Sequence, residues 1–294
     1  MAVSLIPGAR WAAVAARSPL RMLPAAVTAI AFIALFARPM ALLGRDWWSD
    51  PESSHGLLLV PVALWLAWRT GVRRTSPNLG LGLALLLMAV LTRHASALAA
   101  ELYTMRMSML LALAALVICF LGVRQLVRWW LPFTVLVLSV PLPEVVLGAI
   151  TLPLQHTASR LGAFMLDARY IPVQLSGNII RLPGQELFVT EACSGLRSLT
   201  ALLSLGVLIA GCFLSRTPGR LFVIAAAIPI AILANGVRIF FTGFMVHHVS
   251  ADAGTGFLHY TEGWLMFVVA LMGLGALAAG VTAVDRVLSR RGAR

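Results

Sequence analysis

Apolar runs of about 20 residues recur along the whole length of this 294-residue chain, and this repetition restricts the fold more than any other feature. A helix needs roughly 20 apolar residues to cross the hydrocarbon core of a bilayer, because each residue adds about 1.5 Å. Hydrophobic residues make up 60% of the chain and charged residues only 12%. A soluble domain has about 25% charged residues. The pattern therefore predicts an all-α polytopic membrane protein.

We expect about eight transmembrane helices separated by short polar gaps. Their predicted ranges are 23–43, 56–70, 79–99, 107–123, 129–147, 195–215, 221–246 and 263–283. Together they form a single predicted domain over 23–283, between a basic cytoplasmic N-terminus at 1–22 and a basic cytoplasmic tail at 284–294. The first span follows three arginines, as a signal peptide would, but its length and the spans after it favour a retained anchor.

The net charge of +12 comes entirely from arginine, because the chain contains no lysine. Most arginines lie in short gaps between apolar runs, which indicates membrane topology rather than nucleic-acid binding. With the N-terminus in the cytoplasm, the arginine-rich gaps and the tail fall on the cytoplasmic side, and most acidic residues fall outside. The positive-inside rule thus supports an even number of spans with both termini in the cytoplasm.

The longest outer segment, 148–194, contains two predicted elements. The first is an interfacial or re-entrant helix over 150–168, where polar residues interrupt an apolar pattern. The second is a small β-hairpin or three-stranded unit, because short apolar runs are separated by Ser176-Gly177-Asn178 and Pro183-Gly184. This unit leads directly into the start of the sixth span.

That start carries the first candidate site residue, Cys193. Cys193 and Cys212 lie at opposite ends of one span, about 28 Å apart, which exceeds the reach of a disulfide. A helix N-terminus and a nearby arginine, Arg197, favour the nucleophilic thiolate form. We therefore interpret Cys193 as a free, reactive thiol, and Cys119 and Cys212 as small apolar residues of membrane helices.

Two further candidates fall on the same membrane face. Arg238 lies in the outer third of the seventh span, and His259 lies in the predicted outer loop before the eighth. An arginine in an apolar helix costs about 3 kcal/mol on insertion scales, so it normally faces a partner or a polar cavity. Cysteine, arginine and histidine suit acyl transfer, with a nucleophile, a donor for the oxyanion and a proton carrier.

Other interpretations of these residues stay open. A membrane cysteine is often a filler, Arg238 alone could extend to the outer interface, and a loop histidine is usually solvated. A transporter or polysaccharide polymerase would also carry intramembrane arginine without thiol chemistry. A metalloprotease using His247, His248 and His259, with or without Cys193, is disfavoured, because the adjacent histidine pair lacks the i, i+4 spacing of a metal site on a helix. We therefore expect no metal and no cofactor.

Several short motifs, in a fixed order, resemble those of the exosortase/archaeosortase family of polytopic prokaryotic transpeptidases. They are Ala192-Cys193-Ser194-Gly195-Leu196-Arg197, Ala234-Asn235-Gly236-Val237-Arg238, His259 with Gly263-Trp264, and Trp47-Trp48-Ser49-Asp50 with Ser54-His55-Gly56. The resemblance extends over roughly residues 25 to 283. It implies that Cys193, Arg238 and His259 form the Cys-Arg-His triad of the family.

The resemblance also implies a substrate and a location. The substrates would be secreted proteins whose C-terminal sorting signal consists of a short motif, often Pro-Glu-Pro, a membrane helix and a basic tail. Cleavage through a thioester would occur on the periplasmic face of a bacterial inner membrane. The new C-terminus would pass to an acceptor linked to the cell surface or to extracellular polysaccharide.

Five residues are candidates for supporting roles. Glu191 could orient the histidine or stabilise the helix start as an N-terminal anion. Asn235 lies one helical turn before Arg238, and Arg197 lies one turn after Cys193, where it could bind an acidic motif. Asp50 and His55 lie in the first outer loop and could join the site.

Overall fold

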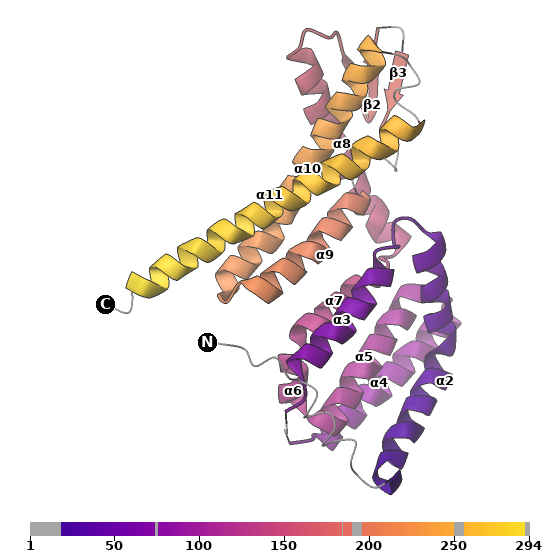
Figure 1. Cartoon of the computed structure of the whole chain (residues 1–294). Helices are drawn as coiled ribbons and strands as arrows, with labels where there is room; N and C mark the ends of the chain where they lie inside the picture. The colour runs from indigo at the N-terminus through magenta and orange to yellow at the C-terminus, as the bar shows by residue number, and fades with distance from the viewer. Residues whose placement is uncertain (1–18, 74–75, 184, 190–195, 250–255, 292–294) are drawn as a thin grey trace. The chain divides into compact units, whose positions relative to one another are not determined.

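The computed structural model describes residues 19–73, 76–183, 185–189, 196–249 and 256–291; at 19–22, 188, 196, 256–262 and 288–291 it describes the backbone only. Two compact units divide the chain, Met1–Pro141 and Leu142–Arg294. Within the described residues both units are built from helices, and one small sheet belongs to the second unit (Figure 1). This architecture confirms the predicted all-α membrane fold with a small sheet.

The described part of the first unit consists of four long helices and two short ones. They are α2 (Pro19–Ser49), α3 (Gly56–Thr70), α4 (Leu79–Leu98), α5 (Leu102–Leu121), α6 (Val123–Arg128) and α7 (Trp130–Leu138). Helices α4 and α5 approach closely, because a Cβ on Gly82 would lie only 2.3 Å from the Cys119 Sγ. Phe36 of α2 and Ala112 of α5 are fully buried in the core of this unit.

Side chains connect the helices at both ends of the first unit. At one end, the buried Gln125 accepts a hydrogen bond from the Arg73 backbone N–H (3.1 Å) and donates one to the Gly71 carbonyl (3.0 Å). At the other end, the Trp47 indole donates to the Ser139 carbonyl over 2.8 Å. These bonds satisfy backbone groups that the ends of α3 and α7 leave open.

The second unit contains one helix before the sheet and three after it. Its described elements are α8 (Glu144–Asp167), β1 (Gln174–Ser176), β2 (Ile179–Leu182), β3 (Gln185–Phe188), α9 (Leu196–Phe213), α10 (Thr217–His248) and α11 (Gly256–Arg291). Helix α10 packs against α8, α9 and α11. A Cβ on Gly236 would lie 2.4 Å from Leu161, and one on Gly243 would lie 2.8 Å from Leu166. Because these contacts advance along both helices together, α8 and α10 run parallel.

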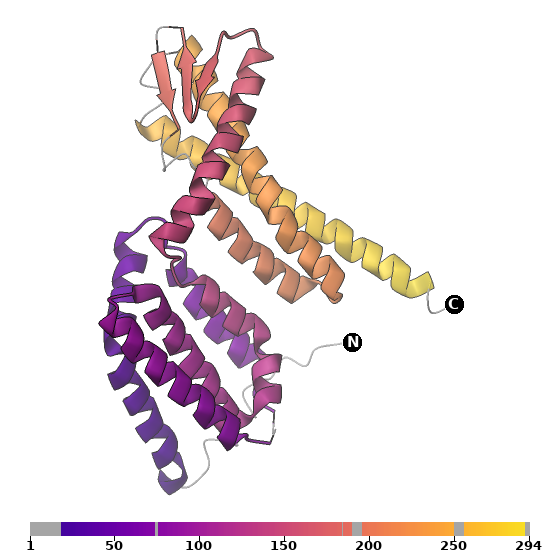
Figure 2. The same cartoon turned by 180° about the vertical axis from the view of Figure 1, so that it is seen from behind.

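The sheet has three antiparallel strands in the order β1-β2-β3. Gly177 occupies the β1–β2 turn with a φ of 65°, a conformation that costs glycine little. Ile180 and Leu182 of β2 are buried, and they share one core cluster with Leu166 of α8 and Val246 of α10. The sheet thus lies against the C-terminal parts of these two helices (Figure 2). Of the two predicted alternatives for this segment, a hairpin or a three-stranded unit, the structure confirms the three-stranded unit.

Five described helices are long and apolar enough to cross a membrane, and two apolar helices are shorter. The long segments are Leu23–Ser49, Leu79–Leu98, Leu102–Leu121, Thr217–His248 and Gly263–Val287, and the shorter ones are Gly56–Thr70 and Arg197–Phe213. These seven correspond to seven of the eight predicted spans. The prediction of one domain over 23–283, with basic ends, stays a prediction.

The fifth predicted span, 129–147, is wrong as a continuous helix. Helix α7 ends at Leu138, and α8 begins only after Pro141 and Pro143. Proline lacks a backbone N–H and disfavours the helical conformation of the residue before it, so the two prolines separate the helices. The helix predicted over 150–168 exists, but it starts within the supposed fifth span.

Candidate active site

Arg238 lies in a pocket where three helices of the second unit meet. The pocket is lined by Ser198 of α9, by Asn235 and Arg238 of α10, and by Gly263 and Phe267 of α11. Arg238 is partly buried, and Asn235 is only 6% exposed. Apolar residues form the remaining wall, so the polar groups face a region poor in water. Electrostatic interactions in such a region are stronger than in bulk water.

The packing of α10 explains how Arg238 reaches this pocket. Gly236 and Ile239 face α8, where they contact Leu161 and Gly162. Because residues two apart lie on different faces of a helix, Arg238 extends away from Gly236 towards α9 and α11. The Arg238 carbonyl accepts a hydrogen bond of 3.0 Å from the Thr242 hydroxyl one turn later.

Gly263 of α11 lies directly against the Arg238 side chain. A Cβ on Gly263 would lie 3.3 Å from Cζ, 3.3 Å from Nη2 and 3.5 Å from Nη1 of Arg238. The guanidinium therefore lies next to Gly263, near the start of α11. This contact brings together two of the motifs that the sequence separates by about 20 residues.

Of the predicted triad, only Arg238 has a described side chain. Cys193 lies outside the described residues, and so does Glu191; the described chain resumes at Leu196, three residues after Cys193. The backbone of His259 is described and its side chain is not. The prediction of a loop at His259 is wrong, because α11 begins at Gly256. In this helix His259 lies four residues, or one turn, before Gly263 and on the same face.

The supporting candidates divide between the two units. Asn235 lines the pocket with Arg238, whereas Arg197 is exposed at the second position of α9. In the first unit, the Asp50 carboxylate accepts hydrogen bonds from the Ser53 hydroxyl (2.6 Å) and from the Glu52 backbone N–H (3.0 Å). These contacts organise the turn between α2 and α3.

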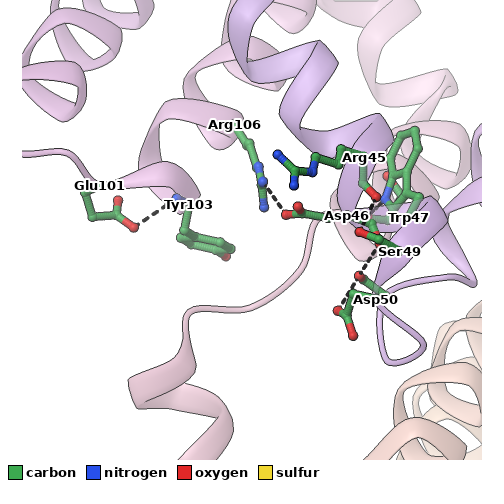
Figure 3. A network of polar contacts seen from close by, with 10 residues as sticks. Arg45, Asp46, Trp47, Ser49, Asp50, Glu101, Tyr103 and Arg106 are labelled. Carbon is green, nitrogen blue, oxygen red and sulfur yellow. Dashed lines mark hydrogen bonds and ion pairs between the residues drawn. The ribbon is translucent and has the colours of Figure 1, made fainter.

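His55 precedes α3 as its N-terminal flanking residue. Its Nδ1 lies 3.1 Å from the Glu52 carbonyl oxygen, within the same turn. Figure 3 shows Asp50 near the end of α2, close to Trp47 and Ser49. For both Asp50 and His55 the observed contacts are local, and a part in the active site stays a prediction.

Sequence reasoning did not select Ser198, which also lines the pocket. The sequence does contain a signal for Ser198: it is a hydroxyl residue in the first turn of an apolar helix, five residues after the candidate nucleophile. The two histidine rings at the end of α10 meet edge to face, with ring centroids 4.7 Å apart and an interplanar angle of 77°. Among the described side chains, no group of three His, Cys, Asp or Glu residues could hold a metal ion.

The fold and the pocket define a polytopic membrane protein in which three helices bring Arg238 and Asn235 to a mainly apolar pocket. The model of the transmembrane exosortase family matches residues 47–276, which is more than half of the chain. The chain therefore belongs to the transmembrane exosortase family. No curated protein and no solved structure matches it.

Proposed function

We propose that this exosortase is a cysteine transpeptidase that cleaves the C-terminal sorting signal of secreted proteins. Cys193 is the nucleophile, Arg238 stabilises developing negative charge, and His259 transfers protons. The substrates carry a Pro-Glu-Pro-like motif, a membrane helix and a basic tail. The reaction takes place at the outer face of a bacterial inner membrane, and it needs no metal or cofactor.

The observation that carries this proposal is the position of Arg238 between α9 and α11. Ser198 and Gly263 line the same pocket as Arg238. In the sequence, Ser198 follows Cys193 by five residues and Gly263 follows His259 by four, and this spacing supports the choice of Cys193 and His259 as partners of Arg238. Membership of the exosortase family adds the expectation of peptide-processing chemistry.

The reaction proceeds in two halves. The Cys193 thiolate attacks the scissile carbonyl carbon, and the electron pair of the C=O bond moves to oxygen, where the N–H groups of Arg238 stabilise it. When the tetrahedral intermediate collapses, the C–N bond breaks and the leaving amine takes a proton from the His259 imidazolium. An acceptor amine, or water, then gives a proton to His259 and attacks the thioester, which releases the thiolate.

Arg197 and Asn235 complete the proposed site. Arg197 is exposed at the start of α9, where its guanidinium can bind an acidic residue of the sorting motif as a paired donor. Asn235 offers an amide to the pocket one turn before Arg238. Glu191, Asp50 and His55 remain proposed contributors that orient the triad or the substrate.

The test is precursor processing in cells that lack the chromosomal copy. Cys193→Ala and His259→Ala are expected to leave uncut precursor in the membrane, with cleavage at least about 1,000-fold slower. Arg238→Lys should slow cleavage by about 100-fold, because lysine keeps the charge and loses the planar donor geometry. Mass spectrometry of the mature C-terminus identifies the cut site and distinguishes hydrolysis from transfer to an acceptor.

Cys212→Ala is the matched control, since Cys212 is an exposed cysteine of helix α9. It should process precursor at the normal rate. Normal processing by Cys193→Ala, in protein that is inserted at normal levels, would contradict the proposal. That result would favour a transporter or polysaccharide polymerase, because neither needs a nucleophilic thiol.

A further inference from the structure

We infer that Gly263 is a positioning residue, which holds the Arg238 guanidinium against α11 and so couples this helix to the site. The inference rests on the proposed function for its effect on cleavage, but its geometric part stands alone. It starts from the contact between one glycine and one side chain that lie on different helices of the pocket.

The distances reveal how the guanidinium is oriented. A Cβ on Gly263 would lie at nearly the same distance from Cζ, Nη2 and Nη1 of Arg238: 3.3, 3.3 and 3.5 Å. Each nitrogen is about 1.3 Å from Cζ. An atom that lay in the plane of the guanidinium, on the outer side of Nη1 and Nη2, would be clearly farther from Cζ than from these two nitrogens. The position of the Cβ is therefore above the face of the group, so the guanidinium turns its face toward Gly263.

This orientation suits a residue that binds an oxyanion. All five N–H donors of arginine lie in the plane of the guanidinium, so contact through its face uses none of them. At the same time, the nearby helix α11 limits the space into which this long and flexible side chain can rotate. A donor that is oriented in advance stabilises charge without a cost of reorganisation during the reaction.

Any side chain at residue 263 disturbs this arrangement. Carbon atoms attract best at about 3.5–4.0 Å, so an added methyl group at 3.3 Å must displace the guanidinium by a few tenths of an ångström. Small displacements of catalytic groups have large effects on rate. The same contact connects Arg238 to the helix that carries His259 one turn earlier.

The matched control is a second glycine of the same helix. Gly273 of α11 is exposed and has nothing within 4 Å of an added Cβ. Gly263→Ala and Gly273→Ala gain the same helix propensity, about 1 kcal/mol per residue in a helix interior. Any difference between the two variants therefore comes from the contact with Arg238.

The experiment measures cleavage and the environment of Arg238 separately, on the full chain in detergent. Phenylglyoxal modifies arginine, and peptide mapping by mass spectrometry gives the rate at Arg238, with Arg216 as an internal reference, because its side chain is 48% exposed. Gly263→Ala should change the Arg238 modification rate several-fold and slow cleavage by roughly tenfold. Gly273→Ala should change neither.

Two results would overturn the inference: an unchanged modification rate at Arg238 in Gly263→Ala, or cleavage by this variant as fast as by Gly273→Ala. Failure of the proposed function is recognised differently. It would appear as normal cleavage by Cys193→Ala, and it leaves the modification assay valid. Gly263→Val extends the series. Because valine is larger than alanine, this variant should change the Arg238 modification rate and the cleavage rate more than Gly263→Ala does.

Discussion

The two units use arginine within apolar helices in different ways. In the first unit, Arg93 Nε donates to the Leu35 carbonyl over 2.7 Å, and Arg106 Nη2 donates to Asp46 Oδ2 over 2.5 Å. Both bonds join two helices. In the second unit, Arg238 packs through the face of its guanidinium and lines a pocket. The first arrangement stabilises a bundle, and the second brings an arginine to the pocket at which we propose that the chemistry takes place.

The contrast shows that an intramembrane arginine is not by itself a sign of function. Its insertion costs about 3 kcal/mol, and that cost is offset wherever a carboxylate or an unpaired carbonyl accepts its N–H groups. In Figure 3, Arg106 of α5 and Asp46 of α2 point toward one another, near Arg45 and Tyr103. The comparison predicts losses of stability for substitutions in the first unit and losses of cleavage for those at Arg238.

The largest expected loss of stability comes from the Arg106–Asp46 pair. Asp46→Ala leaves the guanidinium of Arg106, whose side chain is 5% exposed, without this carboxylate. The Asp46 side chain is 36% exposed, so the pair is only partly buried. The loss of its carboxylate still leaves the buried charge of Arg106 without this partner, which should cost up to about 3 kcal/mol. Unfolding in mild detergent titrated with a denaturing detergent measures this loss. Cleavage per folded molecule should stay near the wild-type rate, whereas Arg238→Lys should show the opposite pattern.

An exposed pair in the second unit is the control for this prediction. Arg181 Nε and Glu186 Oε1 are 2.8 Å apart, and both side chains are about half exposed, at 49% and 46%. Glu186→Ala should cost no more than about 1 kcal/mol, because exposed ion pairs contribute little. If Asp46→Ala and Glu186→Ala lower the free energy of unfolding equally, burial of Arg106 does not increase the contribution of its ion pair.

Most helices and the sheet could be predicted from the sequence, because the length of an apolar run and the residues of a turn are local signals. Seven helices and the three strands follow from such patterns. The break in the fifth predicted span could also be read locally, but the apolar residues around Pro141 and Pro143 masked it. The apolar run starts only at Gly263, so the sequence predicts a loop at His259, although α11 begins earlier.

The contacts between helices could not be predicted in the same way. Nothing in the local pattern pairs Gly263 with Arg238, or Arg93 with Leu35, because these contacts depend on how helices are packed. Ser198 belongs to the same class, since only the packing of α9 against α10 and α11 brings it to the pocket. Chemistry at Cys193 and His259 therefore remains a proposal that starts from sequence motifs.

A smaller effect is expected where Arg93 meets α2. Pro39 has no N–H, so it cannot bond to the carbonyl of Leu35 four residues before it, and Arg93 donates to this oxygen instead. In Pro39→Ala, the new N–H can take over this carbonyl. A double-mutant cycle of Arg93→Met with Pro39→Ala should therefore give a coupling of about 1 kcal/mol.

Pro24 of the same helix supplies the control for this cycle. It also lacks an N–H, but it lies in a different turn of α2, away from the Leu35 carbonyl. Arg93→Met and Pro24→Ala should be additive in the free energy of unfolding. If the cycle with Pro39→Ala is also additive, the bond between Arg93 and the Leu35 carbonyl contributes nothing to stability. The role assigned to arginine in the first unit would then rest on Arg106 alone.

The smallest expected effect concerns Glu101, at the polar connection between α4 and α5. Its carboxylate accepts hydrogen bonds from the Thr104 hydroxyl and from the backbone N–H groups of Tyr103 (2.9 Å) and Thr104 (2.7 Å), so it caps α5. The Thr104 hydroxyl bond is the largest of the influences that lower the pKa of Glu101 below its ordinary value of 4.5. Glu101→Ala should cost about 0.5 kcal/mol of unfolding free energy at neutral pH, the low end for the loss of a cap, because Glu101 is only partly buried.

The pH dependence of this cap follows from the lowered pKa. Folding favours the ionised carboxylate, so its contribution is present above the ordinary value of 4.5 and is lost as the pH falls through the lower pKa of the folded protein. The unfolding free energies of wild type and Glu101→Ala should therefore converge in acid. Glu101→Gln, which keeps one acceptor and cannot ionise, should differ from Glu101→Ala by an amount independent of pH. A constant gap between wild type and Glu101→Ala would mean that ionisation of Glu101 is not coupled to folding.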